Sequence, residues 1–66
     1  MTLSEFEKLS REDKYLYMEG ISADLRDIMT KRFIIGDSWH KIAMSIGKGT
    51  SVDSVRETVK RYLKKF

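Results

Sequence analysis

The 66 residues carry a formal net charge of +3, no cysteine and one histidine. This composition excludes disulfides and a zinc site, and the length limits the chain to one domain, residues 1–66, without a large active-site cavity. No stretch approaches the roughly 18 apolar residues of a membrane span, and the N-terminus lacks the regions of a signal peptide. We therefore expect a cytoplasmic protein that needs no membrane, no metal and no cofactor.

The distribution of helix breakers predicts an all-α fold. Proline is absent, and the four glycines all lie between segments of helical periodicity. Strand-like alternation appears nowhere in the chain. We predict a small four- to five-helix cluster.

The first 20 residues contain two N-cap signals. Thr2 and Glu5 have the spacing of a capping box, which opens a short helix. Ser10, followed by two acidic residues, can open a second helix that stops at Gly20. Whether residues 3–19 form one bent helix or two stays open, because Ser10 can also lie within a helix.

A third helix is predicted for about residues 23–35. Ser22 is its expected cap, and Gly36 is expected to end it in a left-handed conformation. The residues expected on its core side are Leu25, Ile28, Met29, Arg32 and Ile35.

A fourth helix, residues 39–46, is expected between a cap at Asp37 or Ser38 and a stop at Gly47. Trp39, at its start, is interpreted as a residue that packs in the core or at its edge.

Ser51 is the expected cap of a fifth helix, residues 52–65, with Lys64 and Lys65 in its last turn. Its apolar side, at helical spacing, comprises Val55, Val59, Tyr62, Leu63 and Phe66. Together with the fourth helix it predicts a helix-turn-helix over about residues 37–66. The side chains expected to be buried together in this unit are Ile42, Ala43, Ile46, Val55, Val59 and Leu63.

Charge is divided unevenly along the chain. Residues 1–27 contain four Lys or Arg and seven Asp or Glu, a net of −3, whereas residues 28–66 contain nine and three, a net of +6. A positive surface around a helix that is small enough to enter a groove of DNA is typical of a protein that binds the phosphate backbone of nucleic acid.

The second half also carries a set of residues in a family pattern: Arg32, Phe33, Gly36, Ser38, Trp39, Ile42, Ala43, Ser51, Val55, Arg56, Val59, Arg61, Leu63 and Lys65. In this pattern, residues 28–66 resemble the last DNA-binding region of sigma factors and the small phage-encoded transcriptional regulators built on the same module. The resemblance implies that Ala43 lies at the close helix crossing and that Ser51 opens the recognition helix. The chain departs from the family by about two additional residues in the turn, at Lys48 and Gly49.

These observations predict double-stranded DNA as the partner. The expected DNA-binding residues are Lys48, Thr50, Ser51, Ser54, Arg56, Lys60, Arg61 and Lys64. Lys48, Lys60 and Lys64 are assigned to phosphates. Arg56 is the first candidate to read guanine, and Arg61 is the second. A homodimer, or a partner such as RNA polymerase, is expected if the role is regulatory, because one small monomer makes few contacts.

An enzyme is not expected, because one histidine without cysteine offers no nucleophile with its base. A second function class stays open: the same scaffold can serve as a protein-binding module, such as a phage inhibitor of a host nucleic-acid enzyme. Tyr15, Tyr17 and Met18 are then either core residues or a partner-binding stripe.

Overall fold

The computed structural model describes residues 1–66 and confirms an all-α fold. Five α-helices and one π-helical segment follow one another, and there is no strand. The elements are α1 (Leu3–Glu7), α2 (Arg11–Tyr17), α3 (Ala23–Met29), η1 (Thr30–Ile35), α4 (Trp39–Ile46) and α5 (Val52–Leu63). None of these helices combines the length and apolarity needed to cross a membrane.

The N-terminal caps are set by local hydrogen bonds. Thr2 and Glu5 form the predicted capping box, and the bond that the Thr2 amide donates holds the pKa of the Glu5 carboxylate below its ordinary value. The Ser10 hydroxyl accepts a hydrogen bond from the Asp13 amide at 3.1 Å. Residues 3–19 therefore form two helices, because Ser10 has extended backbone angles and begins the second.

The third predicted helix begins at its Ser22 cap, as expected, but its last turns widen into a π-helix. The amide of Gly36 donates to the carbonyl of Lys31, five residues earlier, at 2.9 Å, and Gly36 has the predicted left-handed conformation with φ of 93°. A π-helical turn takes more residues than an α-turn and so shifts the following side chains around the axis. The prediction that Ile35 faces the core is wrong for this reason: it is exposed, whereas Phe33 is buried.

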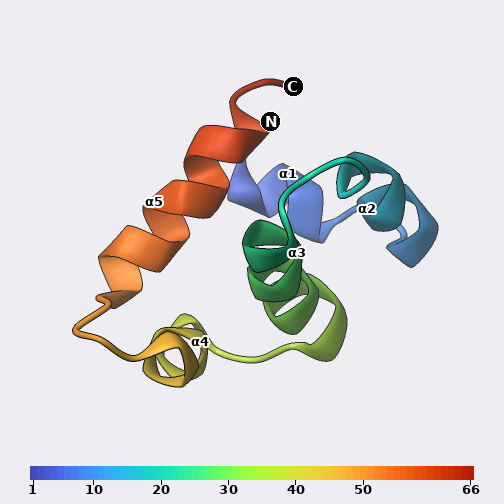
Figure 1. The fold of residues 1–66 in the computed structure, drawn as a ribbon. Coiled ribbons are helices and arrows are strands. Elements are labelled where there is room, and N and C mark those ends of the chain that lie inside the picture. Colours follow the sequence, from blue (N-terminus) through green and yellow to red (C-terminus); the bar gives the residue numbers. More distant parts are fainter.

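Figure 1 shows α5 as one long side of the molecule, with α4 at its beginning and α1 beside its C-terminal end. The two chain termini lie close together at that end, where the amino group of Met1 donates to the carbonyl of Leu63 at 3.2 Å. Because α4 and α1 meet opposite ends of α5, this helix contacts two separate sets of buried side chains.

The larger set, which we call the main core, joins α1, α3, η1 and the C-terminal half of α5. Its ring pair is Phe6 and Phe33, packed edge to face with centroids 4.7 Å apart. The buried side chains of the main core are Phe6, Met18, Met29, Phe33, Val59 and Leu63.

The smaller set, the α4 core, consists of Ile42, Ala43 and Val55 and holds α4 against the first turns of α5. Val59 and Leu63 belong to the main core, so the predicted single cluster is divided in two. Ile46, expected in that cluster, is 42% exposed, because the chain turns away at Gly47 and α5 covers only the earlier part of α4.

Two further predictions fail at the end of α5. The helix ends at Leu63 instead of residue 65, and Lys64 is its C-cap. Phe66 therefore lies beyond the helix, loses the helical spacing that predicted its burial, and is 54% exposed. Of the tyrosine and methionine stripe, Met18 is buried, Tyr17 is half-buried and Tyr15 is exposed.

Arg32 connects the two halves of the fold. Its guanidinium donates to the Glu7 carboxylate at 3.3 Å and to the carbonyl of Asp37 at 3.2 Å. The same group lies 5.0 Å from the ring centroid of Trp39, which also packs edge-on against Phe33. Trp39 is half-buried and contacts both cores, which confirms its predicted packing role.

Candidate nucleic-acid interface

The turn between α4 and α5 is held by its own hydrogen bonds. Gly47, Lys48 and Gly49 all have positive φ, of 70°, 57° and 75°. The hydroxyl and amide of Thr50 both donate to the carbonyl of Gly47, at 2.7 and 3.1 Å. Lys48 is the only non-glycine residue with positive φ, and it is exposed.

Ser38 and Ser51 open the two helices that flank this turn. The Ser38 hydroxyl accepts from the Lys41 amide at 3.1 Å, which settles the choice between Asp37 and Ser38. The Ser51 hydroxyl accepts from the Ser54 amide, also at 3.1 Å, and so confirms the predicted cap of α5.

The outward face of α5 lies opposite its buried valines and leucine. Helical spacing places Ser54, Glu57, Arg61 and Lys64 along this face, and all four are exposed. The 12 residues of α5 span about 18 Å, longer than the roughly 12 Å width of a DNA major groove. Ser54 and Lys64 lie about 15 Å apart along the helix axis, so they cannot meet the same base pair.

Ion pairs divide the cations of α5 into two groups. Arg56 binds Asp53 at 2.7 Å, and Lys60 lies 3.6 Å from Glu57. Arg61 and Lys64 have no ion-pair partner in the structure. Exposed ion pairs contribute at most about 1 kcal/mol, so Arg56 and Lys60 can exchange their carboxylates for other anions at low cost.

The structure places most of the expected DNA-binding residues on the surface. Thr50 and Arg56 are half-buried, and the Thr50 hydroxyl is occupied within the turn. The exposed ones are Lys48, Ser51, Ser54, Lys60, Arg61 and Lys64. Arg56 lies on the flank of α5 and not on its outward face.

Lys41 was missed by the sequence analysis. Its side chain is 74% exposed in the first turn of α4 and makes an exposed ion pair of 3.4 Å with Asp37. The signal that identifies it is its position: in helix-turn-helix proteins, the helix before the recognition helix crosses the phosphate backbone.

The charge of residues 37–66 differs from that of the first two helices of the chain. Residues 37–66 hold seven Lys or Arg and three Asp or Glu, a net of +4. Residues 1–19, which contain α1 and α2, hold three and five, a net of −2. The basic residues are thus concentrated on α5 and on the turn before it.

No family model, curated protein or solved structure matches the chain.

Proposed function

We propose that the protein is a small DNA-binding transcriptional regulator of phage or bacterial type that inserts α5 into the major groove. The observation that carries this proposal is the outward face of α5, where exposed cations stand opposite a fully buried face. Val55, Val59 and Leu63 have at most 3% exposure, so α5 presents its outer side chains from a fixed support. The burial of Ala43 against α5 supports the helix-turn-helix arrangement.

In this proposal, Lys41, Lys48, Lys60 and Lys64 bind phosphates. Their ammonium groups are exposed and lie on α4, at the turn and along α5, so they can follow a backbone on both sides of a groove. Such contacts set affinity and register without reading sequence.

Base reading is assigned to Arg61, with Ser54 about two turns before it on the same face. Arg61 is exposed and has no ion-pair partner, whereas Arg56 must first give up Asp53. A guanidinium group can bind guanine through two parallel hydrogen bonds, a contact worth about 1 to 3 kcal/mol of discrimination. The priority of the two arginines is therefore reversed relative to the sequence prediction.

A salt titration of binding to random duplex DNA tests the function. We expect affinity to fall steeply as salt rises, and alanine at Lys48, Lys60 or Lys64 to flatten the logarithmic slope by about one unit each. Lys8→Ala is the matched control, because Lys8 is an exposed lysine on the acidic side of the molecule. Absence of DNA affinity at low salt would refute the proposal and favour the protein-binding alternative.

Selection of preferred sites from random DNA tests the base-reading assignment. We expect Arg61→Ala to relax sequence preference more than Arg56→Ala does. Arg11→Ala should leave the preference unchanged, since Arg11 is an exposed arginine on α2 without an ion-pair partner. Equal preferred sites for the wild type and Arg61→Ala would show that Arg61 reads no base.

A further inference from the structure

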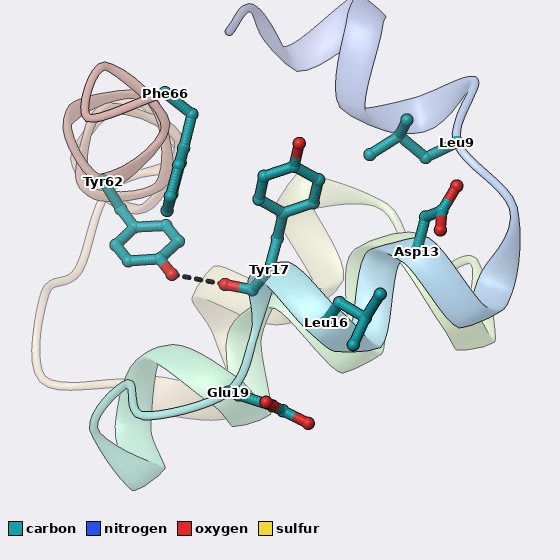
Figure 2. Close-up of a pocket in the computed structure, with 7 residues that line it drawn as sticks. All are labelled: Leu9, Asp13, Leu16, Tyr17, Glu19, Tyr62 and Phe66. Carbon is teal, nitrogen blue, oxygen red and sulfur yellow. Dashed lines mark hydrogen bonds between the residues drawn. The ribbon is translucent and has the colours of Figure 1, made fainter.

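A second surface lies away from the turn, between α2 and the C-terminal end of α5. It is an open groove of about 590 Å³. Its lining residues are Leu9, Asp13, Leu16, Tyr17, Glu19, Tyr62 and Phe66. Figure 2 shows Tyr17 standing in the middle, with Leu9, Asp13 and Leu16 on one side and Tyr62 and Phe66 on the other.

The floor of the groove is fixed by contacts across it. The Tyr62 hydroxyl donates a hydrogen bond to the carbonyl of Tyr17, which is drawn as a dashed line in Figure 2. The rings of Tyr17 and Phe66 pack edge to face with centroids 5.0 Å apart. The groove is therefore present in the folded chain and does not have to be opened by a partner.

The walls expose large apolar side chains. Leu16 on α2 is 63% exposed, and Phe66 on the other wall is 54% exposed. Apolar side chains grouped around a hollow and rimmed by charge mark an interaction surface, because their burial removes apolar area from water.

The charges on the two walls have opposite signs. Asp13 and Glu19 line the α2 wall. On the other wall, the ammonium group of Lys65 lies 5.5 Å from the ring centroid of Tyr62. None of these three charged groups has an ion-pair partner within the chain, so each is free to pair with a partner molecule.

We propose that the occupant of this groove is a second copy of the chain, related by a two-fold axis that passes through the groove. A two-fold axis places the acidic α2 wall of each copy against the basic C-terminal wall of the other. Leu16 of one copy then packs against Phe66 of the other, and Asp13 and Glu19 face Lys65. Each contact is made twice, which gives complementarity in both charge and apolar surface.

None of the residues that line the groove is a candidate DNA-binding residue. The groove is lined by Tyr62 and Phe66 at the C-terminal end of α5. In contrast, α4 and the turn lie at the beginning of α5 (Figure 1). Self-association through the groove leaves α4 and the turn uncovered. The proposal does not depend on DNA binding, and its test is made without DNA.

Sedimentation equilibrium of the intact chain measures the association directly. We expect a reversible dimer and an increase of at least about tenfold in the dissociation constant for Leu16→Glu. Met44→Glu is the control, since Met44 on α4 is equally apolar and 69% exposed but lies outside the groove. Far-UV circular dichroism checks that both variants stay helical. A wild type that is monomeric at millimolar concentration, or a control that loses as much association as Leu16→Glu, would overturn the proposal.

Charge reversal tests the two-fold arrangement. Lys65→Glu and the double variant Asp13→Lys with Glu19→Lys should each weaken self-association, because like charges then face each other. When these two variant chains are mixed, each of the two contacts of a mixed dimer again joins opposite charges. One contact has the wild-type arrangement, and in the other both signs are reversed. A dimer of one Lys65→Glu chain and one double-variant chain should therefore form. If the mixture associates no better than either variant alone, the groove does not bind a second copy in this way.

Discussion

The main core and the α4 core differ in how many side chains they bury. The main core buries six side chains, among them the Phe6 and Phe33 rings, whereas the α4 core buries Ile42, Ala43 and Val55 only. The larger cluster therefore sets the direction of α5, and the smaller cluster attaches α4 to this helix.

This difference bears on the candidate interface. Arg61 and Lys64 lie on the part of α5 whose inner face contributes Val59 and Leu63 to the main core. Lys41 and Lys48 lie on α4 and the turn, which depend on the α4 core. Elements with fewer buried contacts open at lower free energy, so the α4 side should loosen first.

The largest effect is expected from removing a ring of the main core. Phe6→Ala should lower the free energy of unfolding by about 3 to 5 kcal/mol, because Phe6 is fully buried. Both regions should unfold together, since α5 belongs to both. Chemical denaturation followed by far-UV circular dichroism and by Trp39 fluorescence should give coincident transitions; a Trp39 signal that survives loss of the helices would contradict the shared role of α5.

A smaller and more local effect is expected in the α4 core. Ala43→Leu should cost about 1 to 3 kcal/mol by overpacking the contact between α4 and α5. Hydrogen exchange should accelerate at the α4 amides and change little in α3. Met44→Leu, next to it but exposed, is the control. Equal acceleration in α3 would show that the two cores do not open separately.

Arg32 allows the connection between the two regions to be tested. Arg32→Lys keeps the positive charge but loses the planar guanidinium group. That group donates to the Glu7 carboxylate and to the Asp37 carbonyl and stacks on Trp39. The substitution should lower the free energy of unfolding by about 1 to 2 kcal/mol. Glu7→Gln should cost less than about 1 kcal/mol, since that ion pair is partly exposed. A larger loss for Glu7→Gln than for Arg32→Lys in thermal or chemical unfolding would contradict this ranking.

The smallest effect concerns the bond from Tyr62 to Tyr17. Tyr62→Phe should lower stability by about 0.5 to 1.5 kcal/mol at neutral pH by removing this hydrogen bond. Burial raises the pKa of Tyr62 above its ordinary value of 10.0. The stability that the raised pKa contributes is present below pH 10 and is lost as pH rises through the folded-state pKa.

Urea denaturation between neutral and alkaline pH measures this loss. The wild type should decline more steeply above pH 10 than Tyr62→Phe does. Tyr15→Phe is the control, because Tyr15 is exposed and its hydroxyl has no hydrogen-bond partner in the structure. Parallel declines in the wild type and in Tyr62→Phe would show that Tyr62 does not contribute to the pH dependence.

Much of this structure follows from the sequence because the relevant forces act over three or four residues. Each N-cap hydroxyl accepts a hydrogen bond from the amide three residues ahead, so the pattern of hydroxyl residues locates the helix starts. The caps are Thr2, Ser10, Ser22, Ser38 and Ser51. Helical periodicity likewise identified Val55, Val59 and Leu63 as buried.

The tertiary structure decided what local patterns leave undetermined. The π-helical turn left Ile35 exposed, and the division of the buried side chains into two cores left Ile46 exposed. The groove depends on a contact between Tyr17 and Tyr62, which are 45 residues apart. Periodicity places a side chain on a face of its helix, but only the packing of distant helices determines whether that face is covered, paired or left open to a partner.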